Sequence, residues 1–303
     1  MIRMSVSVSL RYDVGASGSL ALRILPAVTA QQRVSGESLV TSLGARSRIV
    51  SGRFGQRMLH VQAAPGPLEI DYSARVDLDP HVVDPSSLNE VGVADLPCDV
   101  LPFLHESPLC PIDALSRLAD QTFGRMPPGH ARVATLCACV RERTRLEPAQ
   151  SGLYPSVLDT LIDKSGSSEH LAHLAIALCR ALYIPARIVS IIWPGSAAPS
   201  GATGLHHCIE VFLGDRWYLF DPTGLAPAMG MIRIGTGRDA SDIPIVSIQG
   251  DAQQTHGRLQ MSALCDASGM ARAGNPSGWA VSSSAPVTAR EDMASAHAGR
   301  RQA

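Results

Sequence analysis

The sequence has almost no net charge, few aromatic residues and hardly any lysine. Its 26 basic and 27 acidic residues leave a formal net charge of −1, aromatic residues make up 4%, and Lys164 is the single lysine. Domains that bind nucleic acid typically carry a basic patch and an isoelectric point above about 9. This chain has a value near 6.8, so the composition excludes a charge-driven partnership with nucleic acid.

A long uninterrupted run of apolar residues is also missing. A membrane-spanning helix needs about 20 such residues, and no window of this chain approaches that length. The start alternates between apolar and polar residues, as in Val6-Ser7-Val8-Ser9-Leu10, and lacks the continuous apolar stretch of a secretory signal. We therefore expect no membrane partner.

Paired cysteine spacings are absent as well. The seven cysteines are an odd number and stand at positions 98, 110, 137, 139, 179, 208 and 265. Such a set fits reduced thiols in a cytoplasm better than the disulfide framework of a secreted domain. We predict a cytoplasmic protein.

Residues 1–80 carry the pattern of an all-β domain. Short apolar runs recur about every ten residues between Gly-, Ser- and Pro-rich turns. From Leu68 to Leu78 apolar and polar residues alternate strictly, which puts the apolar side chains on one face of a half-buried strand. We predict a small β-sandwich at 1–80, followed by a proline-rich linker at 81–111.

Helical spacing of apolar residues begins after this linker. The clearest helix is predicted at 168–183, where leucines and alanines recur on one face. Strands are predicted at 186–193, 206–213 and 217–220, with a Gly214-Asp215 turn that makes the last two a hairpin. We predict an α+β core over 112–265, a helix packed on an antiparallel sheet. Residues 266–303 are rich in Ala, Ser and Gly, and we predict a disordered tail there.

The segment from Gly166 to Arg187, followed by His206, Glu210-Val211 and Asp221-Pro222-Thr223, resembles the core of the bacterial transglutaminase-like family. This family is a branch of the papain-like Cys-His-Asp superfamily. The resemblance implies a papain-like transglutaminase core behind an N-terminal β domain. It also implies His206 as the general base, Asp221 as the acid that orients it, and Ser168 at the position of the nucleophilic cysteine. Across the hairpin, His206 and Asp221 are expected to be neighbours.

The serine at position 168 puts the reaction in question. The ancestral class that the family implies is a thiol acyltransferase or amidohydrolase, as in transglutaminases and cysteine proteases. A serine hydroxyl has a pKa several units above that of a thiol, and a helix N-terminus contributes only ~0.3–1 kcal/mol against ~1.4 kcal/mol for each pKa unit. Only proton removal by His206 could activate Ser168.

We therefore favour a catalytically degenerate protein. In this interpretation Ser168 caps the helix, and the cleft binds a peptide or protein segment. The alternative is an amide or ester hydrolase, or an acyltransferase, that uses Ser168, His206 and Asp221.

Two cysteines are candidates for a replacement nucleophile. Cys179 lies eleven residues further along the same helix, roughly 16 Å away at 1.5 Å per residue, so it is predicted to be a core thiol. Cys208 shares a strand face with His206 and could approach the same cleft, although core packing is the favoured interpretation.

The sequence predicts no metal and no cofactor. His170 and His173 share one side of the helix and, with Glu169, could hold a metal, but no matched third ligand follows. His207 points to the face opposite His206, so the His-His-Cys run makes no compact site. Gly235-Thr236-Gly237 lacks the Gly or Lys that a nucleotide loop requires. The oligomeric state stays open.

Overall fold

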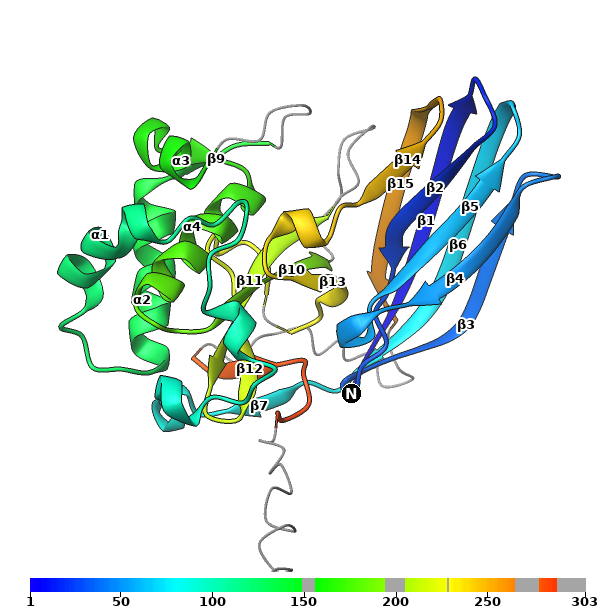
Figure 1. The fold of residues 1–303 in the computed structure, drawn as a ribbon. Helices are drawn as coiled ribbons and strands as arrows, with labels where there is room; N and C mark the ends of the chain where they lie inside the picture. The colour runs from blue at the N-terminus through cyan, green and yellow to red at the C-terminus, as the bar shows by residue number, and fades with distance from the viewer. Residues whose placement is uncertain (149–155, 194–204, 228, 265–277, 288–303) are drawn as a thin grey trace, which may run out of the picture.

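The computed structural model describes residues 1–148, 156–193, 205–227, 229–264 and 278–287 (Figure 1). A β-sandwich lies on one side of the molecule and a sheet covered by helices on the other. The sandwich sheets have the strand orders β15-β1-β6-β3 and β14-β2-β5-β4. Their strands are β1 (Ile2–Val14), β2 (Gly18–Leu25), β3 (Gln32–Thr41), β4 (Arg46–Ser51), β5 (Arg57–Ala63), β6 (Gly66–Leu78), β14 (Val246–Gln249) and β15 (Ala252–Ala263).

The sandwich forms because its long strands alternate. In β1 and β6 every second side chain is buried, and the two strands pair antiparallel with Val8 opposite Tyr72. Side chains of the same face sit opposite each other across the pair, which is the unit that stabilises a sheet. The buried set of both sheets makes one continuous apolar core.

Two strands of the sandwich come from the far end of the chain. β14 pairs with β2, and β15 pairs with β1. The predicted boundaries, with the sandwich confined to 1–80 and the core reaching 265, are therefore wrong at this end. The sequence of β15 contains the polar run Gln253-Gln254-Thr255-His256 and buries little but Gly257. An edge strand of this kind carries no apolar alternation, so its pairing cannot be predicted from periodicity.

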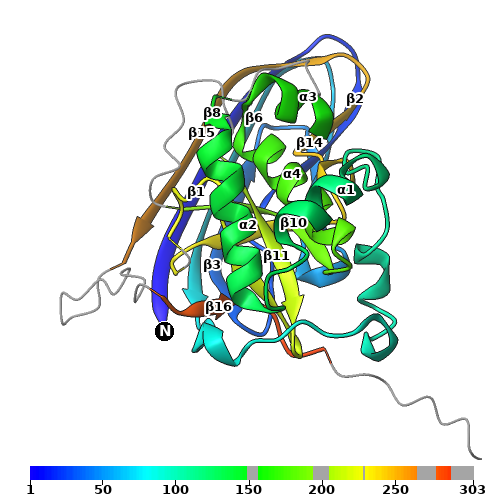
Figure 2. The same cartoon turned by 90° about the vertical axis from the view of Figure 1, so that its left-hand side faces the viewer.

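The second part is a four-stranded antiparallel sheet under helices. Its strand order is β12-β11-β10-β13, and α4 packs on β10 and β11. In Figure 2 α4 appears between α1 and α2. The elements are α1 (Asp113–Phe123), α2 (His130–Arg143), α3 (Val157–Asp163), α4 (Ser168–Ala181), β10 (Ala186–Ile192), β11 (His206–Leu213), β12 (Arg216–Phe220) and β13 (Ile232–Gly237), with a short pair β8 (Arg145–Leu146) and β9 (Ser165–Gly166).

The predicted mixture of helices and antiparallel strands is confirmed. Leu213 pairs with Arg216, so the predicted Gly214-Asp215 turn is the two-residue loop of a hairpin. Gly214 has a φ of +59°, a left-handed conformation that glycine adopts without steric cost. Every residue of β10 and β11 is buried, as expected for strands covered on both faces. None of the helices among the described residues is long and apolar enough to cross a membrane.

The sheet face opposite α4 carries a buried ion triad. Glu210, which is fully buried, pairs with Arg187 of β10 and Arg233 of β13. The Arg187 guanidinium lies 4.0 Å from the ring centroid of Trp217, and Ser284 accepts hydrogen bonds from both arginines. Removing one member of such a triad would leave an uncompensated buried charge. The triad therefore fixes the alignment of β10, β11 and β13 beside the candidate site.

The linker and the tail are more structured than predicted. β7 (His81–Val83) pairs with β16 (Ala280–Ser282), and the Val287 N–H bonds the carbonyl of Asp215. The prediction of a disordered tail is wrong for residues 278–287; the rest of that tail lies outside the described residues. A three-residue strand is too short to leave a periodic signal, and only its partner orders it.

Candidate active site

The first turn of α4 places two serines side by side in different roles. Ser167 is the N-cap residue, and Ser168 is the first helical residue. His170 completes the cap, because its Nδ1 accepts a hydrogen bond of 3.0 Å from the Ser167 N–H. The expectation that Ser168 caps the helix is therefore wrong, since the cap position belongs to Ser167.

Ser168 turns its hydroxyl toward the sheet. Its Oγ accepts a 3.2 Å hydrogen bond from the backbone N–H of His207 in β11. β12 does not reach this part of β11, because the pairing of the two strands stops at Ile209 opposite Phe220. The helix terminus thus meets an edge of β11 that is not paired with β12, and Ser168 lies beside the residue that follows His206.

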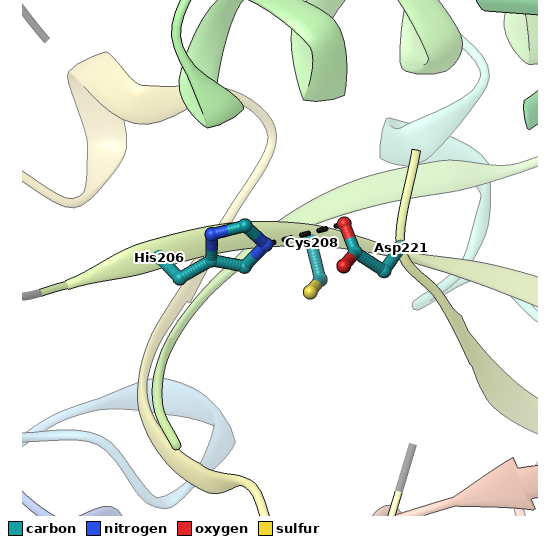
Figure 3. A group of neighbouring side chains, drawn as sticks. All are labelled: His206, Cys208 and Asp221. Atoms are coloured by element: carbon teal, nitrogen blue, oxygen red, sulfur yellow. Dashed lines mark hydrogen bonds and ion pairs between the residues drawn. The ribbon is translucent and has the colours of Figure 1, made fainter. Parts of the chain in front are cut away.

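His206 begins β11 and has only 8% of its surface exposed. Its Nε2 lies 3.2 Å from Oδ1 of Asp221 (Figure 3), and Thr223 Oγ1 lies 3.3 Å from the same nitrogen. The ring of Trp193 meets the imidazole edge-on, with centroids 6.3 Å apart. These contacts hold the ring through Nε2. A carboxylate partner assigns the proton to that nitrogen and leaves Nδ1 to act as a base.

Asp221 is held by its own chain. Its carboxylate accepts hydrogen bonds from the backbone N–H groups of Thr223, Leu225 and Ala226, at 2.8–2.9 Å. The Thr223 hydroxyl bonds both of its oxygens. Burial would raise the pKa of Asp221, but the hydrogen bonds from His206, Ala226 and Thr223 outweigh it, and the pKa lies below its usual value. The group is an ionised carboxylate with a fixed orientation.

The register differs slightly from the expected one. Carried one residue beyond Ile209 and Phe220, it sets Asp221 opposite Cys208 and diagonal to His206. Diagonal neighbours on one face of a sheet remain within reach of long side chains. The imidazole–carboxylate contact therefore forms, although the two residues are not directly paired.

The structure brings all three predicted residues into one place, but only two of them are bonded to each other. His206 and Asp221 are bonded to each other. In the part of the chain that the structure describes, Ser168 Oγ bonds the His207 N–H and makes no hydrogen bond to the His206 imidazole. The site thus contains an oriented base and a serine directed at the neighbouring backbone.

Buried histidines surround the first turn of α4. Burial lowers the pKa of His207 to about 3 and that of His173 to about 4. His173 Nε2 accepts a 3.1 Å hydrogen bond from the Ala240 N–H. Burial also raises the pKa of Glu169, which lies 4.0 Å from His207. Both histidines are therefore neutral at pH 7.

The cysteines and histidines that were alternative candidates for the site have different surroundings. The six cysteines that the structure describes are free thiols. Cys179 is fully buried in the helix core, as predicted. His170 and His173 hold backbone N–H groups instead of converging on a metal. Cys208 is fully buried, as favoured by the sequence, and its Sγ lies beside the His206–Asp221 pair.

Thr223 and the His207 N–H are site groups that motif reasoning did not find. Thr223 stands two residues after Asp221, the spacing of a local turn in which a hydroxyl or carboxylate bonds nearby backbone groups. That spacing is the sequence signal from which the contact of Thr223 with Asp221 could have been predicted. The role of the His207 N–H depends on where β12 ends, which the sequence pattern does not determine.

Comparisons with known proteins agree with this geometry. Residues 116–222 match the model of the transglutaminase-like superfamily. The crystal structure of a proposed cysteine protease from Cytophaga hutchinsonii is similar with a TM-score of 0.82 and 28% identity, over 93% of this chain and 97% of that one. The periplasmic domain of TgpA from Pseudomonas aeruginosa is similar with a TM-score of 0.34 and 17% identity, over 73% of this chain and 87% of that one.

A curated relative covers a shorter stretch. An uncharacterised protein of Mycobacterium leprae is 33% identical over 119 residues, which is 37% of this chain and 42% of that protein. The match thus spans about two fifths of the relative's length. The superfamily match over residues 116–222 and the Cytophaga structure agree with the predicted papain-like core, as do the helix on an antiparallel sheet and the order of Ser168, His206 and Asp221. The chain carries a domain of the transglutaminase-like superfamily.

Proposed function

We propose that this protein is a transglutaminase-like protein without thiol acyl transfer, whose cleft binds a peptide or protein segment. The observation that carries the proposal is the hydrogen bond from the His207 N–H to Ser168 Oγ at the position of the nucleophile. A cysteine at a helix N-terminus is stabilised as a thiolate, which is the reactive form. A serine there remains a neutral hydroxyl.

The energetics of activation support this conclusion. A single N–H donated to a neutral hydroxyl contributes ~0.5–1.5 kcal/mol, and each pKa unit corresponds to ~1.4 kcal/mol. The hydrogen bond and the helix terminus together cannot ionise Ser168 at pH 7. Proton transfer to His206 during attack would be required, and that step needs a hydrogen bond between the two side chains.

The proposed ligand follows from the similar structure. A cysteine protease acts on peptide bonds, and the Cytophaga protein described in that way covers nearly the whole of this chain. A cleft that keeps this shape without a nucleophile would hold an extended peptide and not cleave it. Reduced thiols and a cytoplasmic location remain part of the proposal.

A second candidate function rests on the His206–Asp221 pair. Its 3.2 Å contact and the ionised carboxylate prepare His206 to take a proton. If a substrate shifts the Ser168 hydroxyl onto His206, a Ser-His-Asp hydrolase of amides or esters results.

Labelling with a serine-reactive fluorophosphonate separates the two functions. We expect no labelling of the native protein beyond that of Ser168→Ala, and the same for Ser167→Ala, which removes the neighbouring serine as a matched control. Labelling of native protein and Ser167→Ala that disappears in Ser168→Ala would establish the hydrolase and contradict the proposal.

Peptide binding is tested separately with a displayed random-peptide library. Selected peptides should bind the native protein and lose at least tenfold in affinity on His206→Trp, which places a larger side chain at the site. His256→Trp, on the exposed surface of β15, should leave their affinity unchanged. Equal affinity for both variants would refute binding at this site.

A further inference from the structure

Three donor side chains of different chemistry converge beside the candidate nucleophile. The ligand atoms of His206, Cys208 and Asp221 all lie within 4.8 Å of one another (Figure 3). No other group of three or more His, Cys, Asp or Glu side chains within the described residues converges in this way. Cys208 is fully buried, and the side chains of His206 and Asp221 are 10% and 7% exposed.

The strands themselves produce this arrangement. His206 and Cys208 are two residues apart on β11, so their side chains project from the same face. The pairing of β11 with β12 ends at Ile209 opposite Phe220, and Asp221 follows directly after β12. A His-x-Cys pair and the acid that follows the next strand are thereby placed around one point.

We propose that His206, Cys208 and Asp221 bind one Zn²⁺ ion, through Nε2, Sγ and a carboxylate oxygen. Nitrogen, thiolate and carboxylate are the ligands that zinc takes in proteins, at 2.0–2.3 Å. In a tetrahedral site, ligand atoms at such distances lie about 3.3–3.8 Å apart. The His206–Asp221 contact is already 3.2 Å, and movements of about 1 Å bring the sulfur into range.

The protons balance in a simple way. Zinc takes the place of the proton on His206 Nε2, which moves to Nδ1 of the same ring. The S–H bond of Cys208 breaks, the Zn–S bond forms, and one proton leaves to the solvent. A buried thiolate would be unfavourable alone, and burial raises the pKa of Cys208 well above its ordinary value. A bound metal removes that proton outright.

Charge and orientation favour the ion. The thiolate of Cys208 and the carboxylate of Asp221 supply two negative charges, so a bound Zn²⁺ leaves the buried site neutral. Asp221 is held by the N–H groups of Thr223, Leu225 and Ala226. Such outer contacts orient a metal ligand before the metal arrives. Three protein ligands leave a fourth position for water or a ligand atom.

This inference goes beyond the proposed function and does not depend on it. A bound zinc would occupy Nε2 of His206, and metal binding is measured independently of whether Ser168 reacts with a phosphonate. The outcome of the fluorophosphonate experiment therefore does not decide the outcome of the metal experiment.

The test is a titration of the reduced, metal-free chain with Co²⁺, followed by competition with Zn²⁺. We expect one equivalent to bind, with the near-ultraviolet absorption of a cobalt–thiolate bond that Zn²⁺ abolishes. Second-sphere substitutions already cost 10–100-fold in metal affinity, so Cys208→Ser and Asp221→Asn should each weaken binding by more than ~100-fold.

The exposed thiol of Cys98 provides the matched control. Cys98→Ser should bind Co²⁺ as the native chain does. Should Cys208→Ser fail to fold by circular dichroism, Asp221→Asn and His206→Ala keep the thiol and report on the same site. Binding that survives these substitutions, binding lost in Cys98→Ser, or the lack of a stoichiometric thiolate band would overturn the proposal.

Discussion

The two halves of the site differ in how their side chains are bonded. The strand half, His206 and Asp221, is a bonded pair whose acid is held by backbone N–H groups. The helix half, from Ser167 to His170, uses one serine as a cap and directs the other to the His207 N–H. The strand half is thus held in one orientation, whereas the helix half presents a serine bonded to the neighbouring backbone.

The difference follows from what each half does for the fold. Asp221 satisfies several N–H groups of its own loop, so its removal would disturb the structure whether or not chemistry occurs. The residue at position 168 contributes one hydrogen bond, and a serine supplies it as well as a longer side chain would. Structure alone therefore protects Asp221 more strongly than it protects a nucleophile at position 168.

The largest expected effect is on stability, from Asp221→Ala. The change leaves the N–H groups of Thr223 and Ala226 without their acceptor, and each unsatisfied buried group costs ~1–3 kcal/mol. We expect the free energy of unfolding in urea to fall by about 3 kcal/mol, against about 1 kcal/mol for Ser168→Ala. Similar losses for both variants would contradict the difference between the strand half and the helix half of the site.

A smaller expected effect is a pH dependence of stability that arises from His173 of α4. The pKa of His173 is lowered by burial to about 4, so the unfolded chain takes up a proton first as the pH falls below about 6.5. The stability that neutral His173 provides is complete above that pH and is lost progressively down to about pH 4. From pH 7 to pH 5 the loss is about 2 kcal/mol.

His173→Gln should remove that loss, because the glutamine oxygen can still accept from the Ala240 N–H. Urea unfolding of native and variant protein at pH 7 and pH 5 measures the difference, with His256→Gln on the exposed surface as control. The lowered pKa of Asp221 acts in a separate window, since its contribution is present above about pH 4 and lost only below it. Equal losses for all three proteins would contradict the assignment.

Much of this arrangement could be predicted from local patterns. Alternation revealed the strands of residues 1–80, and helical spacing revealed α4, because burial on one face dictates both. The turn at Gly214 fixed the hairpin that carries His206 and leads to Asp221. The resemblance to a known family, over Gly166–Arg187 and around His206 and Asp221, then supplied the three site positions.

The remainder depends on contacts between distant segments. β15 is a polar edge strand and β16 has three residues, so only their partners β1 and β7 order them. The exchange of roles between Ser167 and Ser168 is a shift of one residue, which is within the ordinary uncertainty of a helix start. The approach of Cys208 to Asp221 follows from the strand register beyond the end of β12, where no sequence pattern acts.

The most direct test of the proposal, that the site lacks only a reactive nucleophile, is the reactivity of Ser168→Cys toward iodoacetamide at pH 6. Peptide mapping follows position 168, and Ser167→Cys serves as the neighbouring control. A thiol at a helix N-terminus beside a histidine has a pKa of ~3.5–7.5, against ~8.5 for a free one. We predict alkylation more than ~10-fold faster at position 168, and lost in the double variant with His206→Ala. Equal rates at the two positions, or a rate indifferent to His206, would contradict the account.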